Sequence, residues 1–322
     1  MQIKSVTEAD VAGKRVLVRV DFNVPTKDGR VMDDTRIQSA LPTLGLLHER
    51  GAANIVVLAH LGRPEGKVVE SLRLAPIEAR LKELINVPFE MHENLRFDAR
   101  EEANDDGFAR ELAQLGDLYV NEAFADSHRA HASIVGVPKY LPSYAGLRLA
   151  EEITRLSQAL TPPSGAVAII GGAKPETKAP LIEKFAAIYS RVLVGGAIAN
   201  EYKPQMNNVL LPQDGVSDAT HVADIGPATR AAWAEILKAA PFVVWNGTMG
   251  IYEDKAFAAG TDAIAKAIID SRAVAIIGGG DTEAAISKFA LDPARIFVSS
   301  GGGAMLEFLL QGTLPGIEAL KK

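Results

Sequence analysis

Short apolar runs rich in β-branched residues alternate along the chain with longer segments whose apolar residues recur at helical spacing. This alternation predicts parallel strands covered by helices on both faces. The predicted strands fall into two groups: 15–20, 55–58 and 118–120 in the first half, and 166–170, 191–194, 242–245, 274–277 and 295–298 in the second. The pattern therefore predicts an α/β fold with two parallel sheets.

A further helical pattern lies between the two groups of strands. Apolar residues recur at helical spacing from 146 to 160, and a break that contains Pro and Gly follows at 161–165. A length of 322 residues exceeds what one core usually fills, so two domains are expected. We place them at 1–145 and 161–308, joined by an interdomain helix at 146–160 with a hinge at one or both of its ends.

The residues that follow the predicted strands differ between the two halves. Ligands of open α/β proteins bind at the carboxyl ends of strands, so these residues mark candidate sites. In the first half they are charged or polar: Asp21, Arg36, His60, Arg63, Arg96, His128, Arg129 and His131. In the second half they are glycines: Gly171, Gly172, Gly195, Gly196, Gly247, Gly250, Gly278, Gly279, Gly280, Gly301, Gly302 and Gly303. Guanidinium groups suit one phosphate and bare backbone N–H groups suit another, so the layout is typical of a phosphoryl-transfer enzyme.

Each motif also has a simpler interpretation. Asp21 and the pair Asp33-Asp34 are residue types common in turns and helix caps. A single His or Arg in a loop is usually solvated, although arginines after several strands favour an anion site. Asp281 follows three glycines and is either a helix cap or a magnesium ligand. The sequence contains neither a P-loop nor a dinucleotide-binding fingerprint, so neither motif explains the glycines.

The amino-acid composition limits the classes of partner and of chemistry that the protein can have. The net charge of -6 argues against a nucleic-acid partner, whose phosphates are bound by many Lys and Arg side chains. The absence of cysteine excludes disulfides, thiolate catalysis and Cys-ligated zinc. The first residues are charged where a signal peptide needs an apolar core, and no apolar run reaches the ~20 residues of a membrane span. We therefore expect a cytoplasmic monomer that binds small molecules, with no membrane partner.

Several motifs, taken together, resemble the phosphoglycerate kinase family in order and over nearly the whole chain. They are VRVDFNVP at 18–25, DDTRI at 33–37, HLGRP at 60–64, ENLRF at 93–97, HRAHAS at 128–133, GGAK at 171–174, WNG at 245–247, GGGD at 278–281 and SGGGA at 300–304. The resemblance implies two Rossmann-like domains with a cleft between the lobes. It places 3-phosphoglycerate on the N-terminal lobe and MgADP or MgATP on the C-terminal lobe, and it returns residues 309–322 to the N-terminal domain.

The resemblance also implies roles for individual residues. The phosphoglycerate site would comprise Asp21, Phe22, Asn23, Arg36, His60, Leu61, Gly62, Arg63, Arg96 and Arg129. The nucleotide site would comprise Gly172, Lys174, Lys178, Gly195, Gly196, Asn246, Glu253, Gly279, Gly280, Asp281 and Thr282, with Asp281 as the Mg²⁺ ligand. The catalytic groups would be Arg36, Lys174, Gly279 and Gly302, which stabilise the phosphoryl group in transfer.

The chain departs from the family pattern by being shorter. Residues 85–92 leave room for about one strand where the family has a strand, a helix and a second strand, and a helix-rich segment is largely missing between Tyr202 and Asp224. We expect reversible phosphoryl transfer from 1,3-bisphosphoglycerate to MgADP. One alternative is a paralogue that binds phosphoglycerate or nucleotide but has lost turnover. A nicotinamide dehydrogenase is a second alternative on fold alone, and the missing fingerprint argues against it.

Overall fold

The computed structural model describes residues 3–217 and 221–321. The chain divides into two compact units, Met1–Ile153 with Thr313–Lys322, and Thr154–Gly312. The division falls inside helix α5 (Leu147–Leu160), whereas the sequence placed the whole of 146–160 between the domains. The return to the first unit begins at Thr313, four residues after the predicted position of 309.

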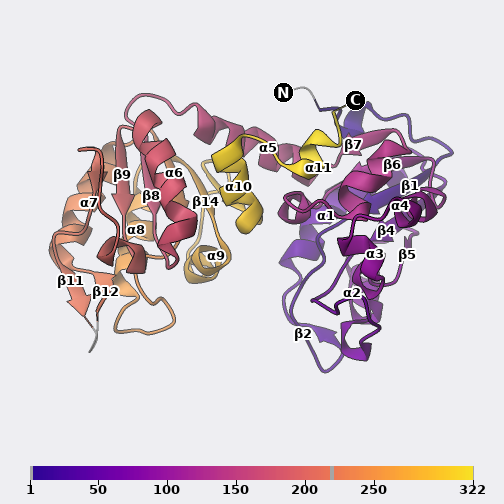
Figure 1. Ribbon diagram of the computed structural model, residues 1–322, viewed down its shortest axis with the longest axis horizontal. Coiled ribbons are helices and arrows are strands. Elements are labelled where there is room, and N and C mark those ends of the chain that lie inside the picture. The colour runs from indigo at the N-terminus through magenta and orange to yellow at the C-terminus, as the bar shows by residue number, and fades with distance from the viewer. Residues whose placement is uncertain (1–2, 218–220, 322) are drawn as a thin grey trace. The chain divides into compact units, whose positions relative to one another are not determined.

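Unit 1 is built on a five-stranded sheet in the order β5-β4-β1-β6-β7, with every neighbouring pair parallel (Figure 1). Its strands are β1 (Arg15–Arg19), β4 (Asn54–Leu58), β5 (Glu90–Met91), β6 (Leu118–Asn121) and β7 (Ser143–Ala145). A small antiparallel hairpin, β2 (Thr26–Lys27) and β3 (Arg30–Val31), follows β1. Because the strands are parallel, their carboxyl ends share one edge, which collects the loops after β1, β4, β5 and β6.

Helices cover both faces of this sheet. Alternate residues of β1, β4 and β6 pack in one core with α1 (Thr35–Glu49) and α2 (Ala75–Leu84). The intervening residues, such as Leu17 and Tyr119, are buried as well, as expected of a parallel sheet covered on both sides. The remaining helices of unit 1 are η1 (Val6–Glu8), η2 (Glu70–Leu72), η3 (Leu95–Phe97), α3 (Ala99–Glu102), α4 (Asp106–Ala113), η4 (Phe124–Asp126), η5 (Ala132–Gly136), η6 (Val137–Lys139) and α11 (Pro315–Glu318).

Unit 2 contains a six-stranded parallel sheet in the order β10-β9-β8-β13-β14-β15. Its strands are β8 (Val167–Ile170), β9 (Arg191–Val194), β10 (Val209–Leu210), β13 (Phe242–Asn246), β14 (Val274–Gly278) and β15 (Ile296–Ser299). One face packs in a core with α7 (Pro227–Ala239), α8 (Ala259–Asp270) and α9 (Gly280–Ile286). Helix α6 (Pro175–Ile188) contacts β8, β9 and α10 (Gly303–Gln311), and Figure 1 shows α6 beside the sheet. Two parallel sheets flanked by helices confirm the predicted α/β fold class.

The two shortened regions have simple structures. Residues 85–92 form the single two-residue strand β5, which pairs parallel with β4. In unit 2, the described residues between Tyr202 and Asp224 form β10 and an antiparallel hairpin, β11 (Gly215–Ser217) with β12 (Val222–Ile225), after the short helix η7 (Ala197–Asn200). A strand and a hairpin thus stand where the family pattern has a helix-rich segment, which we expected to be largely missing from this chain.

Candidate active site

The carboxyl edge of the unit 1 sheet brings together the charged residues that the sequence singled out. The best-defined pair is Arg36, in the first turn of α1, and Asp21, just after β1: Arg36 Nη1 donates to Asp21 Oδ2 at 2.8 Å. Arg36 also lies 3.4 Å from the Asn23 carbonyl oxygen. Burial and the nearby Asp126 raise the pKa of Asp21 to about 6, and Arg36 opposes them. A partly exposed guanidinium is thus fixed at the sheet edge with donors left for an anion.

The loop after β4 is held against the loops after β1 and β5. Gly62 N donates to Asn23 Oδ1 at 3.0 Å, and the Gly62 carbonyl accepts from Arg96 Nη1 at 2.8 Å. Gly62 has a φ of 65°, and a Cβ there would lie 2.8 Å from a Leu72 methyl group. The positive φ, together with the nearby Leu72 side chain, therefore favours glycine at this position. Arg96 is buried, and its Nε and Nη2 lack a hydrogen-bond partner among the described residues.

Not every predicted residue can contribute its side chain. Phe22 is fully buried and Leu61 is 4% exposed, so both side chains belong to the core and any contact with a ligand would come from their backbone. Arg63 is exposed on its loop. Arg129 is half-buried, and its Nε lies 3.3 Å from His128 Nε2.

Arg19 and Asp126 are among the buried charged residues to which the sequence assigned no role. Arg19 is fully buried at the end of β1, and Asp126 is 5% exposed. Arg19 Nη2 lies 3.1 Å from Asp126 Oδ2 and 3.1 Å from His60 Nδ1. The sequence feature that could have identified Arg19 is a charged residue inside an otherwise apolar strand, because a buried charge needs a buried partner.

Unit 2 presents backbone rather than charged side chains at the carboxyl edge of its sheet. Gly171 N donates to the Asn246 carbonyl at 2.8 Å, and Gly172 N donates to the Thr248 carbonyl at 2.7 Å. A Cβ on Gly247 would lie 2.1 Å from the Gly171 carbonyl oxygen, and a Cβ on Gly196 would lie 2.6 Å from Gly172 N. The loops after β8, β9 and β13 therefore approach each other more closely than any side chain allows.

The closely packed loops after β8, β9 and β13 are called the glycine floor below, and a buried lysine stabilises them. Lys178 Nζ donates to Asn246 Oδ1, and Asn246 Nδ2 donates to the Gly278 carbonyl at 2.9 Å. Burial lowers the pKa of Lys178 to about 8, and Asp281 opposes the shift. Gly247 N also donates to Thr282 Oγ1 at 2.8 Å. Lys174 is exposed with a φ of 75°, directly before Pro175 at the start of α6, in a backbone conformation rarely adopted by non-glycine residues.

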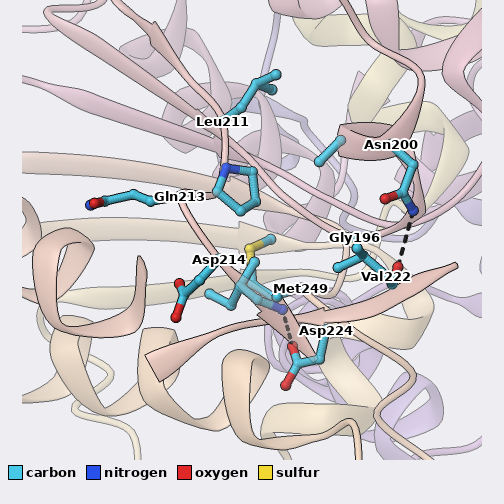
Figure 2. Close-up of a pocket in the computed structure, with 12 residues that line it drawn as sticks. Gly196, Asn200, Leu211, Gln213, Asp214, Val222, Asp224 and Met249 are labelled. Atoms are coloured by element: carbon cyan, nitrogen blue, oxygen red, sulfur yellow. Dashed lines mark hydrogen bonds between the residues drawn. The ribbon is translucent and has the colours of Figure 1, made fainter. Parts of the chain in front are cut away.

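Two cavities adjoin these loops. One, of about 190 Å³, is lined by Gly172, Gly196, Glu253 and Asp281 among others. The other, of about 250 Å³ and shown in Figure 2, is lined by Gly196, Met249, Leu211, Pro212 and the hairpin β11–β12. Both are lined by Gly196 and Val222. The first includes the carboxylates of Glu253 and Asp281, whereas the second combines the apolar side chains of Leu211 and Met249 with polar ones such as Gln213, a mixed lining that suits a base.

The remaining predicted residues lie at helix starts. Gly279, with a φ of 109°, precedes α9, and Gly302, with a φ of 50°, precedes α10. Asp281 lies exposed in the first turn of α9. The described residues contain no group of three or more His, Cys, Asp or Glu side chains that could hold a metal ion. Nor do they include a helix long and apolar enough to cross a membrane.

The chain matches the family model described as phosphoglycerate kinase over residues 6–92, 89–210 and 203–312. The chain belongs to the phosphoglycerate kinase family. It is similar to the phosphoglycerate kinase of Roseiflexus sp. (strain RS-1). The two sequences are 41% identical over 393 aligned positions, and the alignment covers 99% of each chain. It is also 40% identical to that of Moorella thermoacetica, over 97% of this chain and 98% of the relative. Its activity is therefore reversible phosphoryl transfer between 1,3-bisphosphoglycerate and ADP.

Solved phosphoglycerate kinase structures share the fold. The structure from Coxiella burnetii has a TM-score of 0.86 and 34% identity, and covers 99% of both chains. The structure from Pyrococcus horikoshii has a TM-score of 0.87 and 27% identity, and covers 99% of this chain and 98% of the other. The borders between the family-model segments, at 89–92 and 203–210, coincide with the two shortened regions. The 393 aligned positions exceed the 322 residues of the chain by 71, which confirms that it is a shortened phosphoglycerate kinase.

Proposed function

We propose that unit 1 binds 3-phosphoglycerate and that unit 2 binds the magnesium nucleotide. The observation that carries this assignment is the contrast between the two sheet edges. Unit 1 presents the arginines Arg36, Arg96 and Arg129, whose planar forks match carboxylate and phosphate oxygens. Unit 2 presents a glycine floor beside two cavities, which suits a nucleotide with its phosphates against backbone N–H groups.

Within this assignment the protein aligns the reactants and compensates charge. An oxygen of the ADP β-phosphate attacks the phosphorus of the acyl phosphate; the bond from that phosphorus to the carboxyl oxygen breaks, and the carboxylate of 3-phosphoglycerate leaves. The phosphoryl group carries negative charge throughout, so cationic groups lower the barrier. Arg36 of unit 1 and Lys174 of unit 2 are the residues we propose for this role, together with the N–H groups after Gly279 and Gly302.

The metal is proposed to arrive with the nucleotide. Mg²⁺ uses one or two protein carboxylates and takes its other ligands from phosphates and water. Asp281 fits, because it is an exposed carboxylate that lines the same cavity as Gly172. When bound, the ion would neutralise phosphate charge, while Asp281 would hold it at the start of α9.

A coupled assay with 3-phosphoglycerate and MgATP tests turnover. Calorimetry with each ligand alone would separate a working enzyme from a paralogue that only binds, because the paralogue would give binding heats without turnover. A variant of unit 1, Arg96→Met, should weaken 3-phosphoglycerate binding and leave nucleotide binding unchanged. The reverse pattern would contradict the assignment of substrates to units.

We further infer a monomeric protein that acts in the cytoplasm and has no nucleic-acid partner. The net charge of -6 supports the last point, since nucleic acids are bound through surplus Lys and Arg. Light scattering after size-exclusion chromatography would test the monomer, and a mass near twice 34.3 kDa would contradict it.

A further inference from the structure

Arg19 ends β1 with its side chain completely buried, on the face of the sheet where η5 packs. Its guanidinium is held on all sides: Nε donates to Ser133 Oγ at 3.0 Å, and Nη1 donates to the Val20 carbonyl. Ser133 is fixed in turn, because its Oγ donates to Glu101 Oε1 at 2.6 Å and its N donates to Glu101 Oε2 at 2.9 Å. The position of the remaining nitrogen, Nη2, is therefore set by the fold rather than by a ligand.

Nη2 lies 3.1 Å from His60 Nδ1. A guanidinium can only donate, so this contact is a hydrogen bond only if Nδ1 accepts and carries no proton. In a neutral imidazole the proton then resides on Nε2. The competing partner of Nδ1 is Asp126, but its Oδ2 lies farther away, at 3.4 Å, and forms its shorter contact, at 3.1 Å, with Arg19 Nη2.

We propose that Arg19 is a positioning residue that fixes His60 as the neutral tautomer with its proton on Nε2. The inference rests on the proposed function in one respect, namely that His60 faces the bound 3-phosphoglycerate. The ring would then offer the substrate an N–H donor of fixed direction, and the positive charge of the site would come from the arginines alone. Sequence motifs indicate His60 as a ligand but say nothing of its protonation.

The charges around the ring agree with this geometry. Burial lowers the pKa of His60 to about 3; Asp126 opposes the shift, and the cations Arg19, Arg96 and Arg129 add to it. For Asp126, burial raises the pKa, but the charge interactions with His60 first and then with Arg19, Arg96 and Arg129 outweigh burial and the pKa is lowered. A carboxylate that remains charged balances the buried charge of Arg19. The side chain of His60 should therefore stay neutral throughout the pH range in which the enzyme works.

The tautomer can be read directly from the ring nitrogens. Long-range ¹H–¹⁵N spectra of ¹⁵N-histidine-labelled protein distinguish a protonated Nε2 from a protonated Nδ1, and loss of the signals in His60→Gln assigns them. We expect the Nε2–H pattern in the free protein, unchanged between pH 6 and 8. A protonated Nδ1, or a ring that titrates in that interval, would overturn the proposal.

Variants separate positioning from simple structural support. Arg19→Met removes the donor but keeps much of the volume, and Asp126 then becomes the stronger partner of Nδ1. We expect the Nε2–H pattern to be lost, the pKa of His60 to rise, and the KM for 3-phosphoglycerate to increase about 10-fold and become pH-dependent, with the KM for ATP unchanged. Arg19→Lys keeps a donor and should restore part of the wild-type pattern; an unchanged pattern in both variants would contradict the proposal.

Arg15→Met is the matched control. Arg15 begins the same strand, is exposed, and pairs with Asp117 at 2.8 Å, so its loss also removes an arginine–aspartate pair. The ring signals of His60 should not change in this control. If Arg19→Met fails to fold, the spectra of the wild type and of Arg19→Lys still decide which ring nitrogen of His60 carries the proton. A wild-type Nε2–H pattern lost in Arg19→Met without any change in the KM for 3-phosphoglycerate would support the tautomer and contradict the placing of His60 in the substrate site.

Discussion

The carboxyl edges of the two sheets are both proposed to bind phosphate groups, but they differ in the chemical groups that form the site. In unit 1, the proposed anion-binding groups are side chains, supported by a buried network of ion pairs and hydrogen bonds around Arg19, Asp126 and His60. In unit 2, the floor is made of loops so close that a Cβ at Gly196 or Gly247 would collide with neighbouring backbone. The site in unit 1 should therefore be impaired by substitutions that remove side-chain atoms. The site in unit 2 should be impaired by substitutions that add a side chain to a glycine.

The difference extends to burial. His60 and Arg96 of unit 1 are buried, so much of that site is ordered before any ligand binds. In unit 2, Lys174, Glu253 and Asp281 are exposed, and among the charged residues proposed there only Lys178 is buried. An exposed long side chain loses rotamer freedom when it contacts a ligand. The nucleotide should thus order more of its own site than the phosphoglycerate does.

The largest effect is expected from adding one carbon to the floor of unit 2. Gly247 has a φ of 94°, and a Cβ there would meet the Gly171 carbonyl oxygen at 2.1 Å. Gly247→Ala should destabilise unit 2 by about 3 to 5 kcal/mol, because strain at positive φ adds to forced displacement of backbone. Both tryptophans, Trp233 and Trp245, are buried in unit 2, so their fluorescence in urea measures the unfolding of this unit.

Gly302→Ala is the control for that measurement. Its φ of 50° imposes a similar backbone penalty, but no atom of the described residues lies within 4 Å of the added Cβ. The control should cost only about 1 to 2 kcal/mol. Equal losses in the two variants would show that backbone strain, and not the close approach of the loops, makes glycine necessary.

A second, slightly smaller effect tests the side-chain site. Arg36→Ala should lower kcat by at least ~10²-fold, on the order of 3 kcal/mol, with a smaller change in the KM for 3-phosphoglycerate. The reason is that the guanidinium of Arg36 is expected to meet charge on the phosphoryl group in transfer, whereas Arg96 and Arg129 are proposed to hold the substrate. Steady-state kinetics measure both constants. An unchanged kcat would remove Arg36 from the transfer step.

The sequence predicted regular structure better than it predicted the sites. The strands β1, β4, β8 and β13 begin or end within one residue of their predicted bounds, because buried parallel strands are continuous β-branched runs. Strands of two or three residues, such as β7 and β10, were not predicted. A segment of two or three residues is too short to show a hydrophobic periodicity. It becomes a strand only because it pairs with a longer neighbouring strand.

Arg19 and Phe22 show why the site could be predicted only in part. Both lie in one motif, yet the motif could not tell that Phe22 faces the core and that Arg19 is buried beside His60. Arg19 is stabilised by Ser133 and Asp126, which lie more than a hundred positions away in the sequence. Partners so distant are chosen by the tertiary fold. Spacing along the chain therefore indicates which residue types meet a ligand, but not their protonation or their supports.

A third prediction concerns the metal. Asp281→Ala should weaken binding of MgADP by about 30-fold, or ~2 kcal/mol, and leave metal-free ADP almost unaffected, because the carboxylate is proposed to contact only the ion. Calorimetry with and without magnesium measures the two affinities. Asp281→Asn is the matched variant, since it keeps an oxygen ligand without the charge and should lose less. Equal losses with and without magnesium would leave Asp281 as an ordinary residue of the first helical turn.

The smallest expected effect concerns the base, where the shortened segment removes material from unit 2. A base pocket discriminates through apolar walls and a few placed polar groups. Leu211, Pro212 and Met249 line the cavity of Figure 2 together with residues of the hairpin β11–β12. A strand and a hairpin, however, stand where the family pattern has a helix-rich segment.

The glycine floor and Lys178 do not depend on that segment, so phosphate recognition should survive while base selectivity relaxes. Losing an apolar contact worth ~1–3 kcal/mol would bring GTP within roughly 10- to 200-fold of ATP in kcat/KM. Comparison of ATP, GTP and ITP at saturating 3-phosphoglycerate measures this ratio. ITP serves as the control, because it shares the six-position oxygen of GTP and lacks the two-amino group. A preference for ATP above about a thousandfold would mean that Leu211, Pro212 and the hairpin rebuild a complete base pocket, and that unit 2 selects its base as strictly as unit 1 is expected to select its acid.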